Sequence, residues 1–208
     1  MDQDEMIEQL MSYVKRISNT KLYVIVKHLM EKNIEALKIY PAASRNHHEC
    51  VSGLAYHTLS MLKLADSMLD IYPSLNADLM YAGILLHDLG KTVELSGPVV
   101  PTYTLEGKML GHISIAQAMV YEAAKELNIE GEEVVLLQHL ILSHHGKNEF
   151  GSPVLPQIKE AEMIYLIDNI DARMNMFDKA LDQVEPGEYS KRVFALENRT
   201  IYKPKMYE

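Results

Sequence analysis

The segment LMYAGILLHDLGK, residues 79–91, decides the fold because it joins an apolar run to a polar His-Asp pair. Residues 75–89 read as a helix that is apolar on almost every face, which predicts a central, buried position. Gly90 is a plausible stop for this helix. His87 and Asp88 would then end a buried helix, where a charge is costly unless it is paired or bound to a cation.

Most of the remaining sequence is also predicted to be helical, which makes the fold class all-α. Apolar residues at helical spacing indicate further helices at residues 6–17, 22–29, 51–71, 111–127, 132–145 and 156–184. Glycine, proline, tyrosine and β-branched residues between 92 and 110 predict a small β-hairpin or extended excursion. One domain is expected over residues 1–208, with helices of residues 1–45 packed on it and a C-terminal tail at 185–208.

Composition restricts the function classes. The chain has 208 residues, a formal net charge of −9 and one cysteine, Cys50, so it cannot form an internal disulfide. A reducing, cytoplasmic location is the simplest interpretation. The acidic start lacks a secretion signal, and no apolar run reaches membrane-spanning length. The negative charge argues against a surface that coats nucleic acid, but a metal cluster can supply local positive charge for a phosphate.

Several histidine and aspartate side chains are predicted to point into the core from different helices. His57 shares a face with Leu54, Met61 and Leu64, His144 follows Leu137 and Ile141, and Asp168 lies with Ala161, Ile164 and Ala172. Taken singly, a core histidine is usually hydrogen-bonded, an aspartate beside Asn169 usually caps or faces solvent, and His144-His145 can be a polar helix end. As a set, they favour a shared metal.

These residues resemble a known family. His57, the His87-Asp88 pair within His-Asp-Leu-Gly-Lys, and Asp168 resemble the HD-domain superfamily of metal-dependent phosphohydrolases, whose helical bundle holds its site between helices. His112 and His144-His145 resemble the members that hold two metals. Longer runs resemble the YhaM-type 3'-5' exoribonucleases: residues 46–49, 53–57, 87–91, 94–98, 143–147 and 167–172.

The resemblance implies a set of ligands for two divalent ions. The first ion would take His57, His87, Asp88 and Asp168, and Asp88 would bridge to a second ion held by His112 and His144. His145 would be a further ligand or a substrate contact. Imidazole and carboxylate ligands suit manganese, iron, cobalt, nickel or zinc better than calcium, and manganese is favoured by analogy.

Other residues are expected to support catalysis. Lys91 would reach the phosphate and offset developing charge, although a surface lysine at a helix end is the alternative. Asp171 would orient a ligand histidine. Weaker substrate-contact candidates, each of which could be a solvated charge, are Arg45, His47, His48, Lys147 and Arg173.

Three functions stay open from the sequence. The first is 3'-5' hydrolysis of single-stranded RNA or short oligonucleotides by a metal-activated water. The second is hydrolysis of a small nucleotide or cyclic dinucleotide, although residues 150–153 only loosely match the Gly-Tyr-Pro signature of that branch. The third is a non-catalytic binding domain with a degenerate site. Homo-oligomerisation also stays open.

RNA binding depends on surfaces beyond the metal site. YhaM-type proteins carry an N-terminal OB-fold, which nothing before Met6 resembles, so the chain is either a catalytic fragment or a shorter relative. A long strand requires a basic groove or stacking aromatic residues. The sequence shows no basic run or aromatic cluster, which predicts weak binding of long RNA with little dependence on its length.

Overall fold

Almost all regular structure in the described chain is helical. The computed structural model describes residues 2–41, 52–97 and 101–206. The α-helices are α1 (Gln3–Arg16), α2 (Thr20–Lys32), α3 (Ile34–Ile39), α4 (Gly53–Ile71), α5 (Ala77–Leu86), α6 (Lys91–Glu94), α7 (Leu105–Glu126), α8 (Glu132–Ser143) and α9 (Lys159–Leu181). Two 3-10 turns follow the same order, η1 (Asn148–Phe150) and η2 (Phe194–Leu196). The predicted all-α class is confirmed. In these ranges, no helix combines the length and apolar character needed to cross a membrane.

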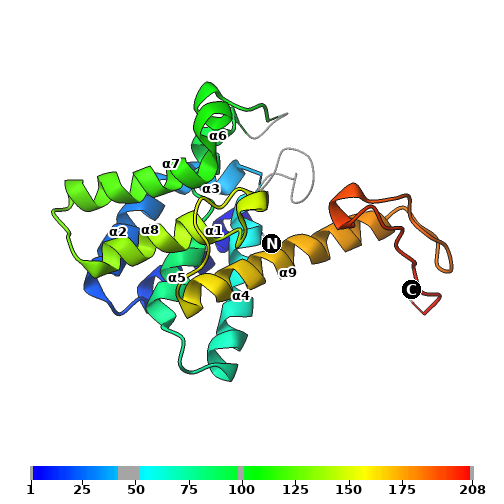
Figure 1. Cartoon of the computed structure of the whole chain (residues 1–208), viewed down its shortest axis with the longest axis horizontal. Helices are drawn as coiled ribbons and strands as arrows, with labels where there is room; N and C mark the ends of the chain where they lie inside the picture. Colours follow the sequence, from blue (N-terminus) through cyan, green and yellow to red (C-terminus); the bar gives the residue numbers. More distant parts are fainter. Residues whose placement is uncertain (1, 42–51, 98–100, 207–208) are drawn as a thin grey trace.

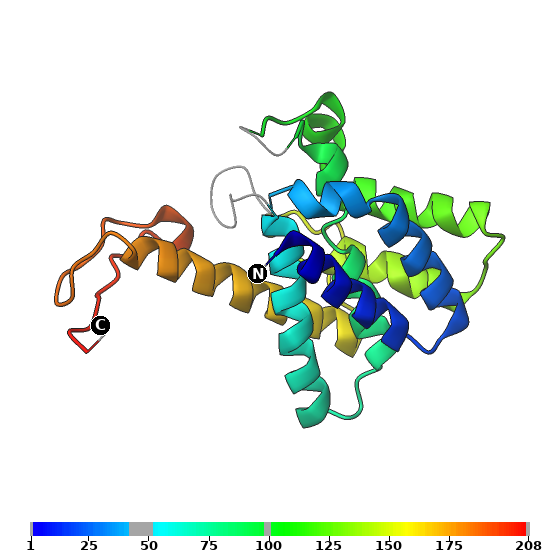
Figure 2. The ribbon, with the colours of Figure 1, turned by 180° about the vertical axis from the view of Figure 1, so that it is seen from behind.

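Helix α5 is the centre of the bundle. It begins where the Asn76 side chain accepts a hydrogen bond from the Leu79 amide, and every residue from Leu79 to Leu86 is buried. Helices α1, α2, α4, α8 and α9 all pack against it (Figures 1 and 2). A Cβ added at Gly83 would lie 2.5 Å from Ile164 Cδ1, so this glycine lets α9 approach closely. The predicted central position of this helix is confirmed.

Gly90 does not end the central helix in a left-handed conformation, as predicted, but allows close packing against another helix. Its φ is −59°, and α5 has already ended at Leu86. A Cβ at this position would lie 2.1 Å from the His112 carbonyl oxygen and 2.9 Å from the Ala116 amide nitrogen. The backbone of α7 therefore rests directly on Gly90, which brings His112 next to the His87-Asp88 pair.

The excursion predicted at residues 92–110 is shorter than expected. An antiparallel bridge joins Leu95 to Tyr103, but residues 92–94 and 105–110 are helical, so the extended prediction is wrong in both places. Thr104 caps the N-terminus of α7, because its side chain accepts a hydrogen bond from the Gly107 amide. The glycines in this segment made it look extended in the sequence, so the start of the helix was not predicted. The helix then kinks at Gly111, where φ is 72°.

The end of α9 and the tail form an arm, defined as residues 173–206, that leaves the bundle. The residues of α9 that are buried all precede it: Glu160, Ala161, Ile164 and Ile167. Antiparallel bridges join two parts of the tail to each other, Tyr189 to Tyr202 and Val193 to Arg199, and the turn η2 between them packs against α9. Both ribbon views show the arm projecting from the bundle (Figures 1 and 2). Strand pairing in the described part of the tail is limited to these isolated bridges.

Candidate metal centre

Helix α4 and the end of α5 bring together the first group of candidate ligands, His57, His87 and Asp88. All three side chains are at most 3% exposed, and one ligand atom from each lies within 4.8 Å of the other two. Asp88 Oδ2 is 3.3 Å from His87 Nε2 and 3.9 Å from His57 Nε2. Asp168, on α9, places Oδ1 3.2 Å from His57 Nε2. The four residues predicted for one ion therefore lie together.

A second group comes from α7 and the end of α8. Ligand atoms of His112, His144 and His145 also lie within 4.8 Å of one another. Asp88 Oδ1 is 3.4 Å from His112 Nε2 and 3.7 Å from His144 Nε2. Because Oδ2 lies beside the first group and Oδ1 beside the second, a single carboxylate stands between them.

The imidazole rings are fixed by bonds at Nδ1. In His87 and His144, Nδ1 lies 2.7 Å from a carbonyl oxygen of the preceding helical turn, that of Ile84 and Ile141 respectively. In His145, Nδ1 lies 2.7 Å from the Phe150 carbonyl oxygen. A carbonyl only accepts, so Nδ1 carries the proton in these rings and leaves Nε2 as a lone-pair donor toward a cation.

Four buried atoms around Asp88 have no hydrogen-bond partner in the described part of the chain. They are His87 Nε2, Asp88 Oδ1, His112 Nε2 and His144 Nε2. Leaving one buried polar group unsatisfied costs about 1–3 kcal/mol. A cation satisfies neutral imidazole nitrogens and a carboxylate oxygen at once, and imidazole with carboxylate is a ligand set typical of first-row transition metals. The residues therefore fit a divalent ion.

The ionisation states also suit a cation. Burial holds the pKa of His144 well below its ordinary value, which keeps the ring neutral. Burial alone would raise the pKa of Asp88, but Lys91 and His87 outweigh it and hold this pKa well below the usual range. Burial opposes protonation of His57, yet its hydrogen bonds to Asp168 and Asp171 raise its pKa to about 9. The carboxylates around His57 thus favour a positive charge, which a proton on the ring supplies when no metal ion is bound.

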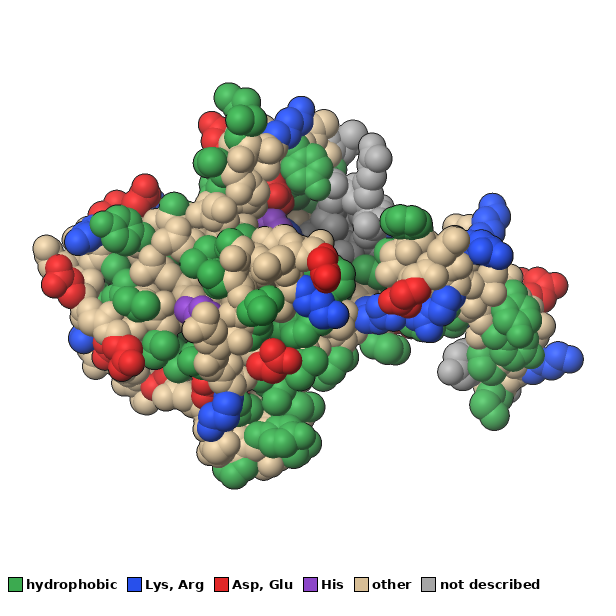
Figure 3. Space-filling model, viewed as in Figure 1, with side chains coloured by type: hydrophobic (Ala, Val, Ile, Leu, Met, Phe, Trp, Pro, Cys, Tyr) green, Lys and Arg blue, Asp and Glu red, His purple; other side chains and the backbone are tan. Residues whose placement is uncertain are grey.

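Only part of the cluster reaches the surface. The side chains of His112 and Asp168 are 15% and 17% exposed, whereas those of His57, His87, Asp88 and His144 are at most 3% exposed. Little histidine surface of any kind is visible on the face that Figure 3 draws. The mouth of the site lies on the side of His112 and Asp168.

Two carboxylates contact the Nδ1 atoms of candidate ligand histidines. Asp171, predicted to orient a ligand histidine, lies with Oδ2 2.6 Å from His57 Nδ1 and also accepts a bond from the Ser60 hydroxyl. Glu94 was not predicted. Its Oε1 accepts bonds from the His112 amide at 3.0 Å and lies 3.2 Å from His112 Nδ1. Glu94 belongs to a run that carried the family resemblance, but nothing in its spacing connected it with His112.

The remaining predicted residues fall into four cases. Lys91 is at the centre, with Nζ 2.6 Å from Asp88 Oδ2. Lys147 is exposed and lies 5.5 Å from the centroid of the Phe150 ring. Arg173 forms a two-pronged pair with Glu197 on the arm, at 2.7 and 3.1 Å, so it is not brought to the ligands. Arg45, His47 and His48 lie outside the described residues.

Replacing Glu94 by glutamine is expected to weaken metal binding at the second group by about 10- to 100-fold, the usual effect of changing such a partner. The amide oxygen still accepts from the His112 backbone, so the fold should persist, but the negative charge that makes His112 a better donor is lost. Calorimetric titration with Mn²⁺ measures the affinity. Glu122→Gln, an exposed change on α7, the helix that carries His112, is the control. Equal affinity in both variants would remove Glu94 from the site.

Comparison with known proteins agrees with the geometry. The HD domain family profile matches residues 54–173, a range that contains all seven candidate ligands. The chain is 56% identical over 205 residues to the 3'-5' exoribonuclease YhaM of Bacillus subtilis (strain 168), covering 99% of this chain and 65% of the relative. It is 57% identical over 201 residues to the protein of the same name in Bacillus licheniformis, covering 97% of this chain and 64% of that relative.

The predicted resemblance is thereby confirmed. The chain spans roughly 65% of the length of the curated relatives that it matches. No solved structure matches it. With the His87-Asp88 pair at the heart of a buried cluster and the family profile covering more than half of its length, the chain belongs to the HD domain family.

Proposed function

We propose that this chain is a metal-dependent phosphohydrolase. The observation that carries the proposal is the set of four unpartnered buried atoms around one carboxylate. One ion would be held by His57, His87, Asp88 and Asp168, and a second by His112, His144 and His145, with Asp88 contributing to both. The ligand chemistry admits manganese, iron, cobalt, nickel and zinc, and the family likeness favours manganese.

Divalent ions in this cluster would supply an activated water and polarise the phosphoryl oxygens. The chain's own residues would hold the ions, admit the phosphate and balance the charge. Asp88 is held ionised between the two groups, and Asp168 and His112 border the mouth through which a phosphate would enter. Lys91, 12% exposed and 2.6 Å from Asp88 Oδ2, balances that carboxylate and places its ammonium beside the entering phosphate. No side-chain nucleophile is needed.

The reaction that we propose is 3'-5' exonucleolytic cleavage of single-stranded RNA or short oligonucleotides, in the cytoplasm. Support comes from the relatives named 3'-5' exoribonuclease YhaM, which are 54–57% identical to this chain. Hydrolysis of a small nucleotide or a cyclic dinucleotide by the same centre is the alternative. A degenerate, non-catalytic site is disfavoured, because a site that had lost its chemistry would be expected to lack at least one ligand or Lys91.

A cleavage assay on RNA separates these functions. The purified chain with Mn²⁺ is expected to shorten a 5'-labelled 12-nucleotide RNA one residue at a time, giving a ladder that begins next to full length. A 3'-labelled copy should release the label at once as a mononucleotide. RNA left intact while a cyclic dinucleotide or a nucleotide is hydrolysed would establish the alternative, and no hydrolysis of any of them would contradict the proposed enzyme.

A further inference from the structure

The arm differs in charge from the rest of the chain. Residues 173–206 contain seven Lys and Arg against five Asp and Glu, a net charge of +2. Residues 1–172 contain 13 Lys and Arg against 23 Asp and Glu, a net charge of −10. Basic and apolar side chains lie close together on the arm in Figure 3. The arm is therefore the part of an acidic protein that a polyanion would approach most easily.

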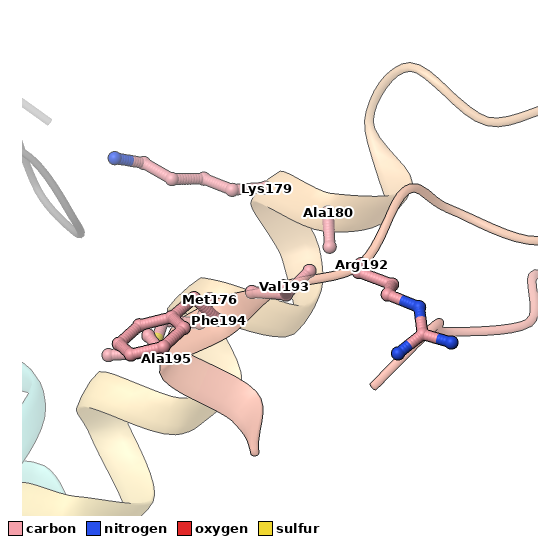
Figure 4. A pocket seen from close by; sticks show the side chains of 7 residues that line it. All are labelled: Met176, Lys179, Ala180, Arg192, Val193, Phe194 and Ala195. Atoms are coloured by element: carbon pink, nitrogen blue, oxygen red, sulfur yellow. The ribbon is translucent and has the colours of Figure 1, made fainter. Parts of the chain in front are cut away.

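A groove of about 380 Å³ lies on the arm between α9 and the returning tail. Met176, Ala180 and Val193 provide apolar lining, and the Phe194 ring at its border is 90% exposed. Lys179 and Arg192 also line the groove, and they extend to opposite sides of it (Figure 4). A groove that combines basic side chains with an exposed aromatic ring is what proteins use to hold the phosphates and stack the bases of a single strand.

A second groove, of about 310 Å³, continues the first one along the tail. It shares Lys179, Ala180, Arg192 and Val193 with the first groove and adds Lys191, Tyr189 and one carboxylate, Glu188. The side chain of Tyr189 is 67% exposed, and Lys191 is exposed. Together the two grooves, which we call the arm groove, form a track with two exposed aromatic rings and three cations.

Helix α9 connects the arm groove with the metal centre. Lys179 follows Asp168 by eleven residues, close to three full turns, so the two side chains project from the same face of the helix. The rise along the axis over this interval is about 17 Å. A strand whose end reaches Asp168 at the mouth of the site can therefore continue along the same helix face to the arm groove.

We propose that the arm groove binds the single-stranded RNA segment that precedes the 3' end engaged at the metal centre. This inference rests on the proposed function. Phe194 and Tyr189 would stack on bases, and Lys179, Lys191 and Arg192 would contact phosphates. The track was not expected from the sequence: Tyr189, Lys191, Arg192 and Phe194 lie within six residues, but Lys179 joins them only because the tail lies beside α9.

A second copy of the chain is the competing occupant, since exposed aromatic rings are also common in protein interfaces. Interface cores are, however, depleted in lysine, whereas Lys179 and Lys191 line the arm groove. Arg192 makes no ion pair within the described residues. It would therefore not have to break a contact with a carboxylate in order to bind a phosphate. Charge and aromatic exposure together favour the nucleic acid.

Binding measured without cleavage tests the groove. In the Lys91→Ala background with Mn²⁺ bound, where hydrolysis is slowed because the ammonium that offsets developing charge is removed, fluorescence anisotropy gives the Kd for 5'-labelled oligouridylates of 4 and 16 nucleotides at fixed salt. The 16-mer is expected to bind at least about tenfold more tightly than the 4-mer. Phe194→Ala should raise the Kd for the 16-mer about tenfold and leave the Kd for the 4-mer unchanged. Arg192→Gln should reduce the slope of log Kd against log salt by about 0.7.

The control is a matched pair on the bundle. Tyr121 is 50% exposed with the Lys125 ammonium 5.6 Å from its ring centroid, and Tyr121→Ala and Lys125→Gln should leave both Kd values unchanged. Unchanged 16-mer binding in Phe194→Ala and Arg192→Gln would overturn the inference, as would a wild-type dimer that Phe194→Ala dissociates without an effect on RNA. Cleavage of the 4-mer with Mn²⁺ is scored separately, so a loss of the proposed activity is distinguishable from a loss of the groove.

Discussion

Asp88→Asn is expected to remove bound metal from both ligand groups and to lower phosphodiester hydrolysis by about 10³-fold or more. The substitution keeps the size of the side chain but removes its charge. Each Asp88 oxygen faces a different group, Oδ2 toward His57 and His87 and Oδ1 toward His112 and His144. Losing this carboxylate leaves the second group with neutral imidazoles only. A loss of several kcal/mol of metal-derived stabilisation corresponds to the expected change in rate.

Elemental analysis of the purified protein, combined with steady-state hydrolysis of an activated phosphodiester, measures the effect. Asp70→Asn, an exposed aspartate at the end of α4, is the matched control and should keep full metal content and rate. Circular dichroism checks that the variant folds. Full metal occupancy in Asp88→Asn would show that Asp88 is not shared between two ions, and the site would have to be assigned to separate ligand sets.

The sequence was informative where function depends on local patterns. The all-apolar stretch before His87 identified α5 as the central helix, because a helix without a polar face has to be covered on every side. The same reasoning predicted that His57, aligned with Leu54 and Met61, faces the core, and its side chain is 2% exposed. In both cases helical periodicity alone determines which face is buried.

The sequence was not informative where contacts depend on the path of the chain. Glu94 and His112 are 18 residues apart, and they meet because α7 kinks at Gly111 and rests on Gly90. Lys179 and Phe194 meet because the tail turns back along α9. Arg173 has the charge of a phosphate ligand, but the same turn gives it Glu197 as a partner. Neither helical periodicity nor a local motif predicts which distant segments of the chain come into contact.

Gly90→Ala is expected to disrupt the second ligand group selectively. The added Cβ would lie 2.1 Å from the His112 carbonyl oxygen, and a backbone atom cannot move aside as the end of a flexible side chain can. The start of α7 after the kink must therefore shift, and His112 with it. Overpacking of this kind costs about 1–3 kcal/mol, occasionally more. His57 and His87 lie on α4 and at the end of α5, which do not need to move.

Metal titration of Gly90→Ala should thus show one binding event at close to the wild-type affinity and the other weakened by at least about tenfold, as expected when a ligand is displaced. The first event is an internal control, because it is measured in the same sample. A fall in melting temperature without metal should accompany the change, since the contact between Gly90 and α7 is also a packing contact. If both events keep the wild-type affinity, the close approach at Gly90 does not position His112. If both are lost while circular dichroism shows an intact fold, the two groups depend on one another more strongly than a shared Asp88 carboxylate explains.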